Sequence, residues 1–235
     1  MTAVVLLHGM LGAPSSMAPV RARLPEGARV VAPWLPAHGP STAPLATTFD
    51  GAVRSLAAEV PAGAVVVGYS LGGRLALALA GVVALGGLVL VGAHAEPGDA
   101  ARRAWDDEHA IAATESMSAL VDRWERLPVF STQTDAQRAA QRPTRLAHDG
   151  ARIAWALSTL GRGRMPDLRP ILASLTVPAR VLVGARDAAL VDAMRRLQLS
   201  PTTSMTVVPD RGHNLILEAP DVVAAAIESV RKELS

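Results

Sequence analysis

The chain has 235 residues, of which 50% are hydrophobic and 19% charged, and its 23 basic and 21 acidic residues give a net charge of +2. This length and composition predict one globular domain, residues 1–235, and exclude a disordered chain. Scattered basic residues exclude the charge clustering of a nucleic-acid-binding protein. The absence of cysteine excludes disulfides, thiolate metal sites and a cysteine nucleophile.

Short, continuously apolar runs recur along the chain and predict strands of a parallel sheet that is covered on both faces. They lie at residues 4–7, 29–32, 64–67, 88–91, 180–183 and 205–208. Helix-compatible stretches lie between or after them, at residues 71–80, 190–197 and 220–234. This alternation predicts βαβ units and a doubly wound α/β fold.

Residues 96–169 break this rhythm, because they are rich in charged and polar side chains and contain no strand-like run. We interpret this segment as a helical insertion that caps the carboxyl edge of the sheet. An ordinary helical excursion without contact to the functional site is the alternative.

No apolar stretch approaches the roughly 20 residues that a membrane span needs, and the N-terminus lacks the features of a signal peptide. A cytoplasmic protein without a membrane partner is therefore expected. The six histidines show no metal-ligand spacing, so no metal or other cofactor is expected. The oligomeric state stays open.

A Gly-x-Ser-x-Gly motif at residues 68–72 centres on Ser70, between a predicted strand and a predicted helix. In this context the motif is typical of a nucleophile elbow, in which a sharp turn presents the serine hydroxyl above the sheet edge. A structural turn that merely contains serine is the alternative.

Asp187 and His213, which come later in the chain, complete a catalytic triad. The order Ser70, Asp187, His213 is the order of the α/β-hydrolase fold. Each follows a predicted strand, so all three are expected at one crevice. Asp192 and Asp210 are the alternative acids.

The loop after the first strand is expected to supply one oxyanion donor, the backbone N–H of Met10, and Leu71 the other. His8 and His38 are expected to have structural roles. No motif surrounds the remaining histidines, which are His94, His109 and His148.

Arg74 lies four residues after Ser70, or about one helical turn. A guanidinium at this position suits recognition of a carboxylate, because its planar fork binds both oxygens and stays charged. An exposed helix arginine is the alternative.

At this point the sequence resembles the 2-succinyl-6-hydroxy-2,4-cyclohexadiene-1-carboxylate synthases, lyases of the menaquinone pathway with the α/β-hydrolase fold. The matching segments are residues 68–77 (GYSLGGRLAL), 7–12 (LHGMLG), 122–130 (DRWERLPVF) and 212–214 (GHN), with Glu218 and Pro220. The segment at 122–130 is the most specific of these, since hydrolases vary in their cap.

The resemblance implies elimination of pyruvate from a tricarboxylate, with Ser70 activated by histidine, so the expected partner is a small anionic substrate. It also implies that Arg74, Arg103 and Arg145 bind carboxylates and that Tyr69 and Trp124 complete the pocket. Neighbouring arginines at Arg102 and Arg142 leave the register of two of these assignments open.

The chain departs from the family pattern in two places. Ala188 and Ala189 stand where a Lys-Phe pair is frequent, and residues 33–39 (PWLPAHG) replace the usual Asp-Leu-Pro-Gly-His-Gly loop. Two other functions stay open: a serine esterase of a small ester or thioester, and a catalytically idle protein that binds a ligand in the same cleft.

Overall fold

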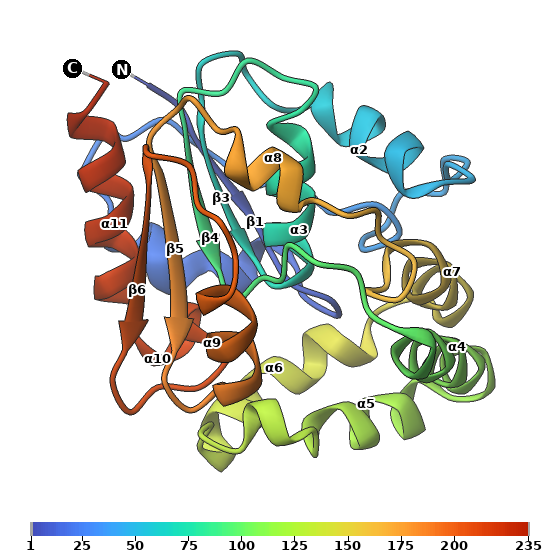
Figure 1. The fold of residues 1–235 in the computed structure, drawn as a ribbon. Coiled ribbons are helices and arrows are strands. Elements are labelled where there is room, and N and C mark those ends of the chain that lie inside the picture. Colours follow the sequence, from blue (N-terminus) through green and yellow to red (C-terminus); the bar gives the residue numbers. More distant parts are fainter. Residues whose placement is uncertain (1, 235) are drawn as a thin grey trace.

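A six-stranded parallel sheet forms the centre of the protein, whose computed structural model describes residues 2–234 (Figure 1). The strand order is β2-β1-β3-β4-β5-β6. The strands are β1 (Val4–Leu7), β2 (Val30–Val31), β3 (Val65–Tyr69), β4 (Gly87–Val91), β5 (Ala179–Gly184) and β6 (Thr203–Val208). The predicted α/β class is confirmed, and each strand overlaps the apolar run that predicted it.

Apolar side chains project from both faces of the sheet, which explains why the strand sequences are continuously apolar. In β1, Val5 and Leu7 join the cluster on one face, whereas Val4 and Leu6 join the cluster on the other. One face packs against α2 (Phe49–Ala57), α3 (Leu71–Leu79), α8 (Arg169–Ala173) and α9 (Ala188–Arg195). The other packs against α1 (Ala18–Arg21), α10 (Leu215–Glu218) and α11 (Pro220–Lys232).

The parallel register brings the carboxyl ends of neighbouring strands to the same edge. Leu7 at the end of β1 pairs with Gly68 of β3, and Tyr69 at the end of β3 pairs with Val91 of β4. Loops that follow these strands therefore meet at one crevice, where open α/β sheets bind their ligands.

Four α-helices and one short 3-10 helix lie beyond this edge, at the lower right of Figure 1. They are α4 (Ala100–Glu115), α5 (Met117–Glu125), η2 (Pro128–Phe130), α6 (Asp135–Leu146) and α7 (Gly150–Leu160). We call residues 96–169 the cap. Side chains of Asp99, Ser116, Thr134 and Asp149 cap the four α-helix N-termini, which explains where these helices begin.

The cap has an apolar cluster of its own, which includes Leu120, Trp124, Phe130 and Ile153. Leu11, from the loop after β1, is buried in the same cluster. The cap is thus packed directly on a loop of the crevice. No helix within residues 2–234 is long and apolar enough to cross a membrane.

Candidate active site

Ser70 occupies a sharp turn between β3 and α3, with φ 52° and ψ −110°. This backbone conformation is strained for a residue with a side chain, and the N–H of Ser70 donates a 2.9 Å hydrogen bond to the carbonyl of Val91. The turn also requires glycine on both sides. A Cβ on Gly68 would lie 2.2 Å from the carbonyl oxygen of Gly72, so the motif brings strand and helix closer than larger residues allow.

Ser70, His213 and Asp187 form a hydrogen-bonded row at the crevice. His213 Nε2 lies 3.1 Å from Ser70 Oγ, and His213 Nδ1 lies 2.7 Å from Asp187 Oδ2. Asp187 follows β5 and His213 follows β6, so the sheet brings together residues that are distant in the sequence. The alternative acids, Asp192 and Asp210, are exposed.

The carboxylate of Asp187 is buried, which raises its pKa, but the hydrogen bond and the charge of His213 lower the pKa more. The net pKa is below the ordinary value, so Asp187 is ionised at neutral pH. An ionised carboxylate accepts the Nδ1–H of His213 and leaves Nε2 free to accept a proton from Ser70. The row has the geometry of a serine nucleophile with its base.

Two backbone N–H groups near Ser70 have no acceptor in the described part of the chain. One belongs to Leu71, the next residue, and the other to Met10, which follows Gly9 at a point where a Cβ on Gly9 would lie 3.6 Å from Ser70 Cβ. Leu71 begins α3, where an N–H has no intrahelical acceptor, and neither it nor Met10 donates to an acceptor within residues 2–234. The N–H of Leu11 donates to Nε2 of buried His38, which holds the loop that carries Met10.

His8, at the end of β1, is fully buried, and its Nε2 accepts a 3.2 Å hydrogen bond from the N–H of Leu35. Burial lowers the pKa of His8 to about 4. The ring is therefore neutral at pH 7 and holds the loop after β2 against the loop after β1. Within residues 2–234 no group of three or more His, Asp or Glu side chains is arranged to hold a metal ion.

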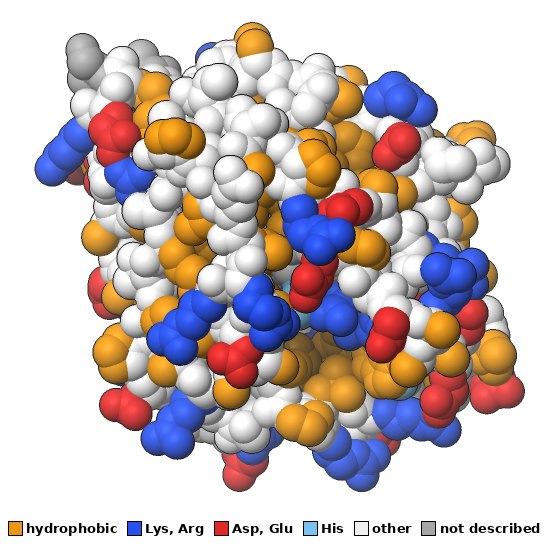
Figure 2. Space-filling model, in the orientation of Figure 1, with side chains coloured by type: hydrophobic (Ala, Val, Ile, Leu, Met, Phe, Trp, Pro, Cys, Tyr) orange, Lys and Arg blue, Asp and Glu red, His pale blue; other side chains and the backbone are white. Residues whose placement is uncertain are grey.

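A cavity of about 330 Å³ opens beside Ser70 and His213. Figure 2 shows this face of the protein hollowed, with basic and apolar side chains around the hollow. The lining also includes Arg74, His94, Arg102, Trp105, Trp124, Phe130, Arg162 and Asp187. The cavity is thus rich in arginine and adjoins the serine.

Arg74, one turn into α3, is 7% exposed and lines this cavity. The pKa of Arg74 is lowered to about 9, mainly by burial and secondly by repulsion from Arg102. Its guanidinium is therefore charged at neutral pH. It forms no ion pair within residues 2–234, and its Nη1 donates to the carbonyl of Leu160.

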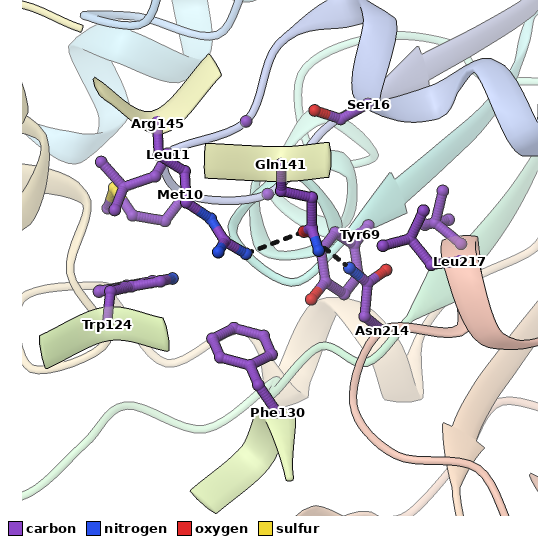
Figure 3. A pocket seen from close by; sticks show the side chains of 13 residues that line it. Met10, Leu11, Ser16, Tyr69, Trp124, Phe130, Gln141, Arg145, Asn214 and Leu217 are labelled. Carbon is purple, nitrogen blue, oxygen red and sulfur yellow. Dashed lines mark hydrogen bonds between the residues drawn. The ribbon is translucent and has the colours of Figure 1, made fainter. Parts of the chain in front are cut away.

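A smaller cavity of about 60 Å³ is lined by three more of the residues that were expected to bind substrate (Figure 3). Tyr69, Trp124 and Arg145 all line it. Arg145 is held by Glu125 Oε1 and Gln141 Oε1, both at 2.9 Å. Because Trp124 also lines the larger cavity, the two spaces adjoin. Burial raises the pKa of Tyr69, so its hydroxyl stays protonated.

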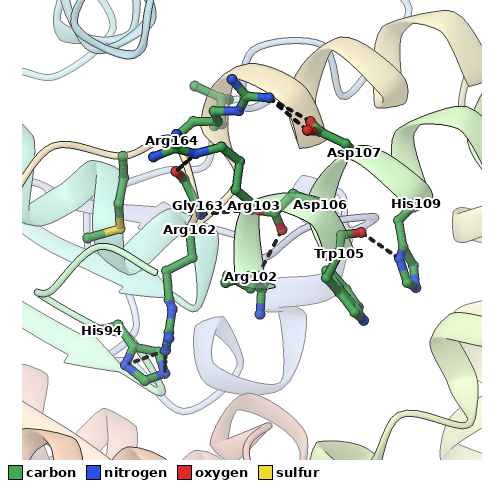
Figure 4. Close-up of polar contacts among 12 residues, drawn as sticks. His94, Arg102, Arg103, Trp105, Asp106, Asp107, His109, Arg162, Gly163 and Arg164 are labelled. Atoms are coloured by element: carbon green, nitrogen blue, oxygen red, sulfur yellow. Dashed lines mark hydrogen bonds and ion pairs between the residues drawn. The ribbon is translucent and has the colours of Figure 1, made fainter. Parts of the chain in front are cut away.

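Arg103 does not lie where it was expected. It is exposed, lines neither cavity, and its Nε donates to the carbonyl of Gly163. Its neighbour Arg102 lines the larger cavity, with Nε 2.9 Å from Oδ1 of buried Asp106 (Figure 4). Successive residues of a helix point about 100° apart, so only one of two adjacent arginines on α4 faces the crevice.

Sequence reasoning missed His94 and Arg162, which also line the larger cavity. His94 lies three residues beyond the end of β4, and this position at the strand end was a signal that could have found it. Arg162 lies in the loop between α7 and α8. No local pattern marks it.

A model of the alpha/beta hydrolase family matches residues 4–226. The 2-succinyl-6-hydroxy-2,4-cyclohexadiene-1-carboxylate synthase of Serratia proteamaculans is 31% identical over 96% of this chain and 91% of that protein. The synthase of that name from Salmonella heidelberg is also 31% identical, over 97% and 92%. The resemblance found in the sequence is confirmed.

Two solved structures have a similar fold. MenH from S. aureus is 26% identical and superposes with a TM-score of 0.85, covering 99% of this chain and 94% of that one. A thermophilic esterase from Thermogutta terrifontis has a TM-score of 0.78 at 23% identity, with 100% and 90% covered. The predicted α/β-hydrolase fold is confirmed.

Proposed function

We propose that this protein, which belongs to the alpha/beta hydrolase family, is a lyase that forms 2-succinyl-6-hydroxy-2,4-cyclohexadiene-1-carboxylate by eliminating pyruvate. Relatives that carry this name match almost the whole chain. The proposed partner is a small substrate with several carboxylates. The reaction requires no metal or other cofactor, because a proton transfer and a bond cleavage suffice.

The observation that carries this proposal is the buried cation of Arg74 in the cavity of Ser70. A charged guanidinium without an ion pair is costly to bury, and Arg74 has only neutral contacts within residues 2–234. A substrate carboxylate supplies the missing negative charge. A neutral ester has no group that needs this cation.

The proposed reaction begins when His213 Nε2 accepts the proton of Ser70 Oγ, while Asp187 stabilises the imidazolium. The serine oxygen then takes a proton from a ring carbon of the substrate. The electron pair released there moves into the ring, and the bond from carbon to the enolpyruvyl oxygen breaks. The enolpyruvate leaving group takes the proton from the His213 imidazolium and becomes pyruvate. Serine, which already carries the proton from the ring carbon, and histidine are then both in their starting states.

Negative charge develops on a substrate carbonyl oxygen as the proton leaves. The N–H groups of Met10 and Leu71 are proposed to donate to this oxygen. Preorganised donors of this kind contribute a few kcal/mol to stabilisation of the transition state. Arg74 and Arg145, with Tyr69 and Trp124, are proposed to hold the rest of the substrate.

Ester hydrolysis is the second candidate, because the same hydrogen-bonded row also suits formation of an acyl-enzyme at Ser70. In that reaction the serine oxygen attacks the ester carbonyl instead of removing a proton. The two functions differ in their need for Arg74.

The test incubates the purified protein with the enolpyruvyl-bearing tricarboxylate precursor and follows pyruvate, beside a panel of short-chain aryl esters. We expect catalytic release of pyruvate and little ester turnover. Efficient turnover of neutral esters without pyruvate release would contradict the proposal and establish the esterase.

A further inference from the structure

Arg162 is a second cation without an anionic partner in the larger cavity, and its side chain is half-buried. Its Nη1 lies 2.8 Å from His94 Nε2 and 3.0 Å from His94 Nδ1 (Figure 4). Its Nε is buried and has no hydrogen-bond partner. Arg162 forms no ion pair within residues 2–234. The side chain is fixed at one end and has unused donor capacity.

The acidic groups nearby do not neutralise this site. Asp106 is fully buried, but its Oδ1 accepts from Arg102 and its Oδ2 accepts from the N–H of Gly163 at 2.7 Å. Glu96 and Asp99 act on Arg162 only at longer range, without an ion pair. Burial, followed by repulsion from Arg102, lowers the pKa of Arg162. Positive charge therefore exceeds negative charge around this part of the cavity.

His94 is a neutral support for Arg162. Burial, followed by the charges of Arg162 and Arg74, lowers the pKa of His94 to about 3. A neutral imidazole has one ring nitrogen that accepts a hydrogen bond from the guanidinium. His94 thus orients Arg162 without consuming its charge, which leaves that charge available to a ligand.

We infer that Arg162, oriented by His94, is a specificity-determining residue that binds a second carboxylate of the substrate. Arg74 and Arg162 line the same cavity, and each has a charge that no side chain neutralises. A ligand with two separated carboxylates satisfies both, whereas a monocarboxylate satisfies one. The identity of the substrate rests on the proposed function, but the preference for a dicarboxylate does not.

The test measures binding to the Ser70→Ala protein, which cannot turn over substrate by serine chemistry. Malonate, succinate, glutarate and the monocarboxylate butyrate are titrated by calorimetry. At least one dicarboxylate is expected to bind more tightly than butyrate. Adding Arg162→Leu is expected to weaken that binding about 10- to 100-fold, the loss that corresponds to a hydrogen bond between charged groups, and to leave butyrate within about threefold.

Two further variants in the same background separate charge from packing. Arg162→Lys keeps the charge and is expected to restore part of the dicarboxylate preference. Arg164→Leu removes an exposed arginine only two positions away, which pairs with Asp107 outside the cavity, and is expected to change nothing. Thermal melting confirms that each variant is folded. A dicarboxylate preference that survives Arg162→Leu, or no preference in the parent, would overturn the inference.

This outcome is independent of the proposed reaction. If the protein with Ser70 intact releases no pyruvate but dicarboxylate binding needs Arg162, the proposed function fails and the inference holds. If pyruvate is released, Arg162→Leu is expected to raise KM about 10-fold or more with a smaller change in kcat. A KM that does not change would refute the inference while leaving the proposed function intact.

Discussion

Arg74 Nη1 donates a 2.7 Å hydrogen bond to the backbone carbonyl of Leu160. This contact joins α3, the helix that begins beside Ser70, to the last residue of α7 in the cap. The carbonyls at the end of a helix lack intrahelical partners, so a cation is well placed there. Arg74 is therefore both a cation in the cavity and a link between the helix after β3 and the cap.

Replacing Arg74 separates the two candidate functions. Arg74→Ala is expected to lower kcat/KM for pyruvate release about 100-fold, because a hydrogen bond between charged groups contributes about 1.5–3 kcal/mol. Turnover of a neutral aryl ester is expected to fall only a few-fold, through loosening of the cap. Arg74→Lys, which retains the charge, is the matched control. Equal losses on both substrates would contradict carboxylate binding by Arg74.

Ser70→Ala is expected to lower the main activity at least about a thousandfold, because the row then has no hydroxyl to pass a proton or attack a carbonyl. The measurement is kcat under saturating substrate, with circular dichroism to show that the fold is retained. Alanine removes only the hydroxyl at the strained turn. If substantial activity remains in pure protein, the reaction does not use serine chemistry.

The two adjacent arginines of α4 provide a paired test. Arg102→Gln is expected to raise KM for the anionic substrate about 10-fold, because a cation that lines the cavity is lost. Arg103→Gln is expected to leave KM within about twofold, since Arg103 lies outside both cavities. In Arg102→Gln the glutamine amide can still donate to Asp106, which Arg102 contacts in the parent protein. A larger effect at Arg103 than at Arg102 would contradict this orientation of α4 towards the cavity.

The lowered pKa of His8 predicts how the free energy of unfolding depends on pH. Its pKa is lowered to about 4 in the folded protein, from 6.5 in an unfolded chain, so the unfolded state binds more protons below pH 6.5. The stabilisation is complete above pH 6.5 and is lost as the pH falls towards 4. Between pH 7.5 and pH 5 the loss attributable to His8 is about 2 kcal/mol.

The measurement is urea denaturation of the parent protein and His8→Gln at both pH values. Glutamine retains an acceptor for the N–H of Leu35 but does not titrate. The parent is expected to lose about 2 kcal/mol more than the variant on acidification. Because His38 and His148 also have lowered pKa values, both proteins lose stability. An identical loss in the two proteins would show that His8 does not titrate in this range.

Much of the fold was determined by the sequence itself. The strands were predicted because a sheet buried on both faces demands uninterrupted apolar runs. Val65, Val66 and Val67 of β3 form such a run, and all three are fully buried. The sharp turn at Ser70 was predicted because it requires glycine at Gly68 and Gly72, whatever the substrate. These are local constraints, so a local pattern records them.

Only the tertiary structure decided which cap residues face the crevice. Whether Arg102 or Arg103 lines the cavity depends on the rotation of α4 about its axis, which is set by packing of the cap on Leu11 and its neighbours. The contact between His94 and Arg162 joins residues 68 positions apart. Such pairs depend on how distant elements are placed against one another, and no short sequence pattern contains that information.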